Sequence, residues 1–241
     1  MKQFSVLLLA LLLSVGVALA DDPPGPEDDI FVDDGAVITQ VGDDNDASIT
    51  QEGIHAARIY QEGNENEADI GQTGINNTAF ISQVGNYNDN SVTVAGEDNT
   101  AILVQQGDNM DLNLKVTEGV GRTVDIRQFG ETHTVGFVGE DGKIFQSGDY
   151  NELFVSQYGE GHVVTALDGE DYIQDGDHNT INILQYGTDQ TAQVGQFGDQ
   201  NTMSIFQDGS DHTAVVEQRG NNHTASIHQD GNGNHASVSQ Q

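Results

Sequence analysis

A short Gln-x-Gly element recurs along this chain at intervals of about eleven residues. In the C-terminal third the spacing is eleven residues without exception, with glutamines at Gln185, Gln196, Gln207, Gln218, Gln229 and Gln240. The N-terminal third repeats the element with small slips, and Val94 stands in one glutamine place. A fixed period of this kind is typical of repeat architectures, in which each unit stacks on its neighbours.

The repeating unit has the pattern N-x-A-x-(I/V)-x-Q-x-G, as in the segment Asn77-Thr-Ala79-Phe-Ile81-Ser-Gln83-Val-Gly85. Its named positions alternate with variable ones, which is the period of a β-strand with one buried face. The glycine and the polar residues after it favour a tight turn. A helix does not fit, because the apolar residues recur every two positions rather than every three or four.

One such strand cannot bury its face alone, so two units are expected to form a coil of about 22 residues. The predicted fold is all-β: a two-sheet β-solenoid that stacks in cross-β fashion in a fibre. Its sheets would lie roughly 10 Å apart, with a rise of roughly 4.8 Å per coil.

Inner-face amides are expected to form hydrogen-bonded ladders along the axis, each amide donating to the next layer. The predicted ladder glutamines are Gln40, Gln51, Gln61, Gln72, Gln83, Gln105, Gln128, Gln157, Gln185, Gln196, Gln207, Gln218, Gln229 and Gln240. The predicted ladder asparagines are Asn45, Asn66, Asn77, Asn88, Asn99, Asn151, Asn179, Asn201 and Asn234. The predicted turn glycines are Gly42, Gly53, Gly63, Gly74, Gly85, Gly107, Gly187, Gly198, Gly209, Gly220 and Gly231.

The spacing is irregular in the middle of the chain. Counting from neighbouring units places Thr117, Phe137 and Leu167 where glutamine is expected. The coils between about residues 134 and 176 are therefore not assigned by the sequence, and one of them is open to being shortened or looped out.

The chain divides into three segments, of which the last is the repeat array. Residues 1–20 have a basic start, an apolar middle and an Ala-Leu-Ala end, which predict a secretory signal peptide. The apolar run is shorter than the ~20 residues of a membrane span, which disfavours an anchor. Residues 21–35 are acidic and contain all three prolines, and we expect a flexible leader there. Residues 36–241 form the predicted repeat array.

Composition restricts the partners and the source of stability. The formal net charge of −32 makes nucleic acid an unsuitable partner, because nucleic-acid binding needs clustered lysines and arginines. The chain has no cysteine, and 35% of its residues are hydrophobic. Backbone hydrogen bonds and polar side-chain pairs must therefore stabilise the fold more than is usual.

The C-terminal unit, Gln229-Asp-Gly231-Asn-Gly233-Asn234-His-Ala236-Ser-Val-Ser-Gln240, resembles the curlin repeat of bacterial curli subunits over its whole length. Most other units share the glutamine, first glycine, asparagine and alanine but lack the second glycine, and the resemblance covers roughly residues 36–241. It implies a functional amyloid subunit that leaves the cell through an outer-membrane channel, meets a nucleator subunit and joins a fibre in the biofilm matrix. The acidic leader departs from the glycine- and asparagine-rich leader usual in the family.

Metal and cofactor sites are not expected. His133, His162, His212 and His223 take the asparagine place, and we interpret them as ladder members. Turn residues Asp43, Asp44, Asp108 and Asp199 are candidates for weak calcium binding, although solvated charges that slow aggregation are the favoured interpretation.

Catalysis is not expected either. The sequence contains neither a Gly-x-Ser-x-Gly elbow nor a phosphate-binding loop. The aromatic residues that follow the glutamines, Phe129, Tyr158, Tyr186 and Phe197, are predicted to face outward.

The sequence therefore favours a secreted fibre subunit on the bacterial surface that polymerises end to end, used in biofilm matrix and surface adhesion. One alternative is a monomeric β-solenoid adhesin that depends on calcium or binds a ligand on a flat face. Another, within the family, is the minor nucleator subunit.

Overall fold

The computed structural model describes residues 35–116, 119–135, 143–167 and 173–241. These residues form strands and turns. The strands are β1 (Gly35–Val41), β2 (Asp46–Glu62), β3 (Glu67–Val84), β4 (Asp89–Glu97), β5 (Thr100–Asp108), β6 (Asp111–Val116), β7 (Thr123–Glu131), β8 (Thr134–Val135), β9 (Lys143–Ser147), β10 (Glu152–Glu160), β11 (Val163–Ala166), β12 (Gln174–Asp175), β13 (Thr180–Thr188), β14 (Thr191–Phe197), β15 (Thr202–Ser210), β16 (Thr213–Arg219), β17 (Thr224–Asn232) and β18 (His235–Gln240).

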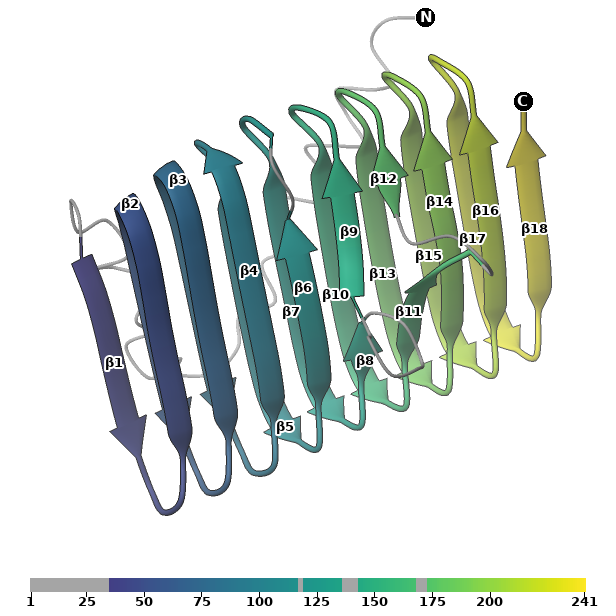
Figure 1. Ribbon diagram of the computed structural model, residues 1–241. Coiled ribbons are helices and arrows are strands. Elements are labelled where there is room, and N and C mark those ends of the chain that lie inside the picture. The colour runs from purple at the N-terminus through teal and green to yellow at the C-terminus, as the bar shows by residue number, and fades with distance from the viewer. Residues whose placement is uncertain (1–34, 117–118, 136–142, 168–172) are drawn as a thin grey trace, which may run out of the picture. The chain divides into compact units, whose positions relative to one another are not determined.

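Each strand from β1 to β16 pairs in parallel with the strand one coil further along the chain, and β17 and β18 end the array, as Figure 1 shows. The first sheet contains β1, the second halves of β2 and β3, and then β5, β7, β10, β13, β15 and β17. The second sheet contains the first halves of β2 and β3, and then β4, β6, β8 with β9, β11 with β12, β14, β16 and β18. The fold is thus a parallel β-solenoid of about nine coils of ~22 residues, and the predicted fold class is confirmed.

The core lies between the two sheets and follows from the period of two. In β13 the side chains of Ile181, Ile183 and Gln185 are buried, while the residues between them are half-buried. The same positions in the other coils supply stacked rows of Ala, Val, Ile and Leu. Each strand contributes only about two apolar side chains to the core, beside the polar columns described below.

The early slip in spacing has a local cause. β2 and β3 run through the turn between the two sheets, and their register shifts between Ile54 and His55. Ile54 pairs with Ile75, whereas His55 pairs with Asn77, so that Asn76 is the additional residue in the longer coil. Gln51 and Gln61 are therefore only ten residues apart, although both keep their places on the inner face.

The irregular middle of the chain keeps the coil register. Leu112 pairs with Val135 and Asn113 pairs with Lys143, so residues 136–142 are added between two halves of one strand. Residues 167–172 are added in the same way, between Ala166 and Ile173 in the next coil of the second sheet. The coils between residues 134 and 176 are therefore neither shortened nor looped out as wholes.

Two glutamine places inferred by counting are wrong. Val116, and not Thr117, pairs with Val94. Gln174, and not Leu167, pairs with Gln196. At Leu167 counting failed because the extra residues enter a strand. The extra residue of the earlier coil lies between Val116 and Thr123, because Val94 pairs with Val116 and Thr100 pairs with Thr123. Phe137 lies outside the described residues.

The signal peptide and most of the leader lie outside the described residues, which begin at Gly35. Within the described ranges, no helix has the length and apolar character needed to cross a membrane.

Candidate functional site

Two columns of glutamine side chains run through the array, one behind each sheet. In the first sheet the amide nitrogen of Gln185 donates to Gln207 Oε1, and Gln207 donates to Gln229 Oε1, both at 2.8 Å. The second nitrogen hydrogen of Gln207 is donated to the carbonyl of Thr191 across the coil, at 3.3 Å. The same Nε2-to-Oε1 hydrogen bond between glutamines of neighbouring coils joins Gln40 to Gln61, Gln61 to Gln83, Gln105 to Gln128, Gln128 to Gln157, and Gln157 to Gln185.

The second sheet has a corresponding column in two pieces. Contacts join Gln51 to Gln72, and later Gln146, Gln174, Gln196, Gln218 and Gln240 in succession. Val94 and Val116 occupy the intervening places and are both buried. Gln146 and Gln174 were not among the residues that we predicted for the ladder. Gln174 pairs with Gln196, 22 residues further on, whereas Gln146 pairs with Gln174 across an irregular interval of 28 residues.

The first column changes partners between Gln83 and Gln105, although the two residues are in register. Gln83 donates to the carbonyls of Glu67 and Asn88, at 2.9 and 3.0 Å. Gln105 Oε1 accepts instead from the amide of Asn90, at 2.7 Å. Asn90 occupies a place that is alanine in most coils, and its amide reaches across the core to this acceptor.

The asparagines stand where each turn enters a strand, and they hold three layers together. Asn77 Nδ2 donates to the carbonyl of Thr73 in its own turn and to the carbonyl of Gly96 in the next coil, at 2.9 and 3.0 Å. Asn77 Oδ1 accepts from the backbone N–H of Asn99, at 3.0 Å. The contacts of the other predicted asparagines follow this scheme.

Histidine reproduces the asparagine contacts. His133 Nε2 donates to the carbonyl of Phe129 at 3.1 Å, because a carbonyl oxygen only accepts, and its Nδ1 accepts from the backbone N–H of His162 at 3.3 Å. His162 repeats this geometry with Tyr158 and Gln190. The two imidazoles are therefore neutral Nε2–H tautomers. Burial lowers the pKa of His133 to about 4, and it lowers the pKa of His162 as well.

These contacts leave neither histidine a ring nitrogen to offer to a metal, since both nitrogens of each ring are used. No group of three or more His, Asp or Glu side chains with metal-binding geometry occurs among the described residues.

Arg122 and Gln190 also take asparagine places. The buried Arg122 guanidinium reaches the carbonyls of Gln146 and Gly148 in the next coil, and burial lowers its pKa. Gln190 Nε2 reaches the carbonyls of Tyr186 and Gly209, whereas its Oε1 is buried and accepts no hydrogen bond from the residues that the structure describes. Sequence reasoning missed both residues, because it sought asparagine or histidine at a position that the structure defines by its contacts.

The turn glycines are required by contacts between coils. All the predicted turn glycines have positive φ, for example 126° at Gly209. A Cβ atom added at Gly209 would lie 1.7 Å from the carbonyl oxygen of Gly231 in the next coil. The residue two positions later is also left-handed in most turns, but it is usually not glycine: φ is 56° at Asp44 and 58° at Thr132.

Several turn aspartates bind backbone groups. Asp108 Oδ1 accepts from the backbone N–H of Asn86 at 2.7 Å, and Asp199 Oδ1 accepts from that of Asp177 at 3.0 Å. Asp43 instead donates its N–H to Asn64 Oδ1. Carboxylate and carboxamide oxygens thus act interchangeably in these turns.

Comparison with known families gives one result. The family model of the curlin associated repeat matches residues 34–53, 56–85, 63–95, 176–209 and 209–241, which together cover just over half of the chain. The chain belongs to the curlin-repeat family. This confirms the resemblance drawn from the sequence, and it makes the protein a member of a family of curli-like amyloid subunits. No curated protein gave a significant match.

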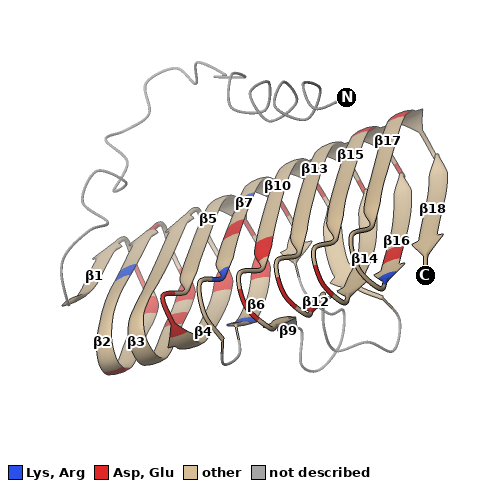
Figure 2. Ribbon diagram, turned by 90° about the horizontal axis from the view of Figure 1, so that it is seen from above, with Lys and Arg blue, Asp and Glu red and all other residues tan. Residues whose placement is uncertain are grey.

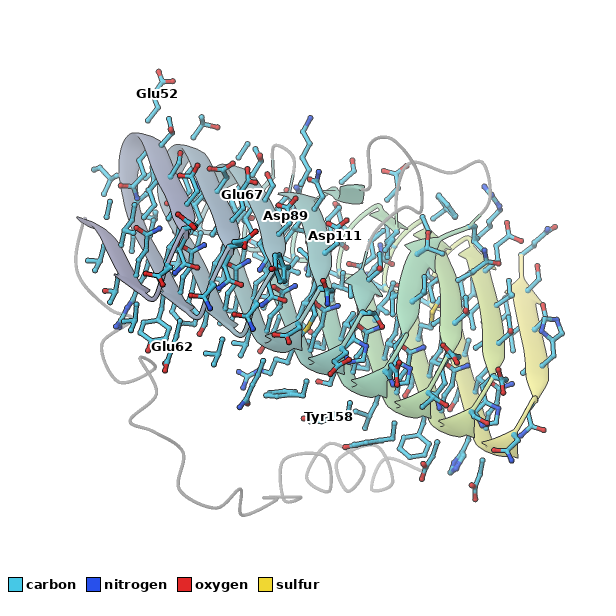
Figure 3. The ribbon with its side chains drawn as sticks, turned by 90° about the horizontal axis from the view of Figure 1, so that it is seen from below. Glu52, Glu62, Glu67, Asp89, Asp111 and Tyr158 are labelled. Carbon is cyan, nitrogen blue, oxygen red and sulfur yellow. The ribbon has the colours of Figure 1, made fainter. Side chains whose placement is uncertain are left out.

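The curlin array carries an acidic column on the outer face of its second sheet. Asp46, Glu67, Asp89 and Asp111 pair in succession, one coil apart. Figure 3 shows Glu67, Asp89 and Asp111 following one another along this face, with Tyr158 on the opposite side. Figure 2 shows few basic residues near the acidic ones. Partial burial, and then the charges of Glu67 and Asp111, raise the pKa of Asp89.

The first sheet of the curlin array carries an aromatic column. The rings of Phe129 and Tyr158 stack with centroids 5.0 Å apart, and those of Tyr158 and Tyr186 stack at 4.8 Å. The ring faces cover one another along the axis, so only their edges face outward. Phe197 lies on the other sheet, beneath the guanidinium of Arg219 at 4.4 Å.

The two outermost curlin coils expose strand edges. Ile38 on β1 is 44% exposed although it belongs to the inner row, whereas Ile59 in the next coil is fully buried. At the other end, Ala236 and Val238 on β18 are only partly buried. The outer edges of β1 and β17 pair with no strand among the described residues.

Proposed function

We propose that this curlin-repeat chain is the structural subunit of an extracellular amyloid fibre, and that subunits join end to end by strand stacking. In this proposal the fibre lies on the bacterial cell surface, where it serves biofilm matrix and adhesion. The subunit is secreted, has no catalytic activity and needs no cofactor. Its partners are further copies of itself, a nucleator subunit and an outer-membrane secretion channel.

The observation that supports this function best is that the first coil exposes apolar side chains, such as that of Ile38, at positions that are buried in the inner coils. Burying an apolar side chain such as that of Ile38 stabilises a protein by roughly 1.5–3 kcal/mol. Unpaired strand edges are templates for further strands, and most soluble proteins cover them with charges, bulges or additional elements. A further coil stacked on this edge would bury the exposed inner-face side chains and would also pair the free strand edge.

The regular last coil favours the major subunit over the nucleator. β17 and β18 keep the register of the preceding coils without a shift. The nucleator role remains the alternative within the family.

The alternative outside the family's fibre role is a monomeric adhesin that depends on calcium. In the turns that hold Asp108 and Asp199, one carboxylate oxygen of each already accepts a backbone N–H. This use of the oxygens favours a structural role for the turn aspartates over a dedicated calcium site.

The test is assembly of residues 21–241, desalted from denaturant and incubated with and without calcium. We expect a lag, then growth of thioflavin fluorescence, and a meridional reflection at ~4.8 Å in fibre diffraction. A protein that stays monomeric in both conditions would contradict the fibre role. A monomer that folds only with calcium and unfolds on chelation would establish the adhesin instead.

A further inference from the structure

The end coils carry open hydrogen-bonding groups at the positions that every internal pair of coils uses. At the C-terminal end, Gln229 Nε2 donates to the carbonyl of Thr213 at 3.1 Å and meets no second acceptor within the described ranges. Gln240 Nε2 likewise donates only to the carbonyl of Thr224 among those residues, at 3.2 Å. Each therefore retains one amide hydrogen directed along the axis, where Gln207 meets its next neighbour.

The N-terminal end carries the complementary acceptors. Gln40 and Gln51 donate to the next glutamines in their columns, at 2.8 and 2.9 Å. The Oε1 atom of each accepts from no donor in the part of the chain that the structure describes. These are the acceptors that the open amide hydrogens of Gln229 and Gln240 require.

The asparagine column ends in the same complementary way. Asn234 donates from its Nδ2 to the carbonyl of Asp230 and from its N–H to His212 Nδ1. Its Oδ1 accepts from none of the described residues. Asn45, at the other end of this column, has a backbone N–H in the position from which Asn66 donates to Asn45 Oδ1.

We infer that the C-terminal coil of one subunit docks on the N-terminal coil of a second copy in one register, with β17 beside β1 and β18 beside the first half of β2. This inference rests on the proposed fibre function and specifies its joint. Gln229 then meets Gln40, and Gln240 meets Gln51, so both glutamine columns continue through the joint. Ile227 covers the exposed Ile38 of the second copy.

The same register places His235 of one subunit opposite Asp46 of the next. Within its own subunit Asp46 is followed by Glu67, so this end of the acidic column is repulsive. The N-terminal coil carries Asp43, Asp44, Asp46 and Glu52, whereas the C-terminal coil carries Asp230, His228 and His235. In the inferred register the imidazole of His235 thus faces the first carboxylate of the acidic column.

Other groups around His235 are few. On β16 its partner is Thr213, and the charged residues of that strand, Glu217 and Arg219, lie nearer its far end. On the other sheet, β17 carries His228 and Asp230. In the inferred register His228 faces Thr39, which carries no charge.

The register is tested by cross-linking. Ser48 and Ser237 are exposed on the second sheet and oppose one another across the inferred joint. Within one subunit they lie eight coils apart, about 38 Å at the usual strand spacing. A disulfide needs Cα atoms about 4.4–6.8 Å apart, so oxidising fibres of the S48C/S237C variant should give a ladder of covalent oligomers.

The matched control for this experiment is S48C/S226C, because Ser226 is equally exposed but lies on the other sheet. It should form fibres and give no ladder. Fibres of S48C/S237C without a ladder would overturn the register while leaving the fibre function standing. Failure of the unmodified chain to form fibres counts against the function itself.

The contact between His235 and Asp46 is tested by elongation of preformed seeds at low ionic strength. We expect His235→Glu to slow elongation about two- to fivefold, because it places a second carboxylate opposite Asp46, and this is the range of an exposed charge pair. His228→Glu, which would face Thr39, should slow elongation less. In an Asp46→Asn background the effect of His235→Glu should vanish. Equal elongation rates of the unmodified chain and His235→Glu would overturn this contact.

Discussion

The imidazole rings of His133 and His162 stack face to face in adjacent coils, with centroids 4.9 Å apart and planes 3° from parallel. Both rings are neutral, and both are bonded through each nitrogen. The stack follows from the register of the irregular coils, since 29 residues separate the two histidines in the sequence.

The lowered pKa of His133 predicts a loss of stability in acid. Because the unfolded chain takes up this proton near pH 6.5 and the folded chain only near pH 4, stability should fall as pH drops between these values. The loss is at most about 3 kcal/mol, at ~1.4 kcal/mol per pKa unit. Urea unfolding of freshly desalted monomer at pH 7, 5.5 and 4.5 measures it.

The informative comparison for that prediction is His133→Asn, which keeps the ladder contacts and removes the titration. The stability advantage of the unmodified chain over this variant should shrink as pH falls. A constant difference between the unmodified chain and His133→Asn from pH 7 to 4.5 would show that His133 is not neutral in the folded state.

Removing one ladder glutamine should lower the free energy of unfolding by more than the contribution of a single hydrogen bond. Gln207→Val leaves the Gln185 amide and the Gln229 Oε1 without partners in a buried column, which we expect to destabilise the coil by about 2–3 kcal/mol. The double variant Gln185→Val/Gln207→Val should cost less than the sum of the single changes, because neighbouring effects are not additive. Val94 and Val116 already form such an apolar pair. Denaturation midpoints of the three variants test this, and strict additivity would count against a connected column.

Neutralising the acidic column should speed assembly. The raised pKa of Asp89 means that its charged form is disfavoured in the folded array. Its contribution to stability is therefore fully present below its unfolded pKa and is lost as pH rises through the folded one. Asp89→Asn should stabilise the array by about 0.5 kcal/mol, since like charges opposite one another on neighbouring strands are unfavourable.

Salt should act on the same repulsion. At 0.1 M ionic strength charges are screened beyond about 10 Å, so sodium chloride should accelerate assembly of the unmodified chain more than that of Asp89→Asn. Asp175→Asn is the control, because Ser147 and Phe197 are its neighbours. Calcium that accelerates assembly far beyond sodium chloride of equal ionic strength would indicate specific binding rather than screening.

The second left-handed position in the turns offers a stabilising change. Thr132 has a φ of 58°, a conformation that is costly for a β-branched residue and easy for glycine. Thr132→Gly should therefore raise the free energy of unfolding by about 0.5–1 kcal/mol. The same change at Thr134, within β8, should lower it. If both changes destabilise the array equally, the strain at Thr132 is not significant.

Much of the fold could be predicted because each repeat unit contains the sequence signals of its own strand and turn. The alternation in a segment such as Ile181-Asn-Ile183-Leu-Gln185 identifies a strand, and the spacing of the glutamines identifies the coil. The coils around the added residues 136–142 could not be assigned, because an addition inside a strand has no turn signal. The break between Gln83 and Gln105 depends on Asn90 across the core, a contact that no count of residues contains.

The direction of the glutamine columns gives the array an electrical polarity. In each glutamine-to-glutamine contact described above, the Nε2 of one coil donates to the Oε1 of the next, in the direction from Gln40 toward Gln229 and from Gln51 toward Gln240. The side-chain amide dipoles are therefore aligned, as peptide dipoles are in an α-helix. Parallel stacking of identical subunits preserves this alignment. A long filament would thus have one carbonyl-rich and one amide-rich end, with different affinities for ions and different growth rates.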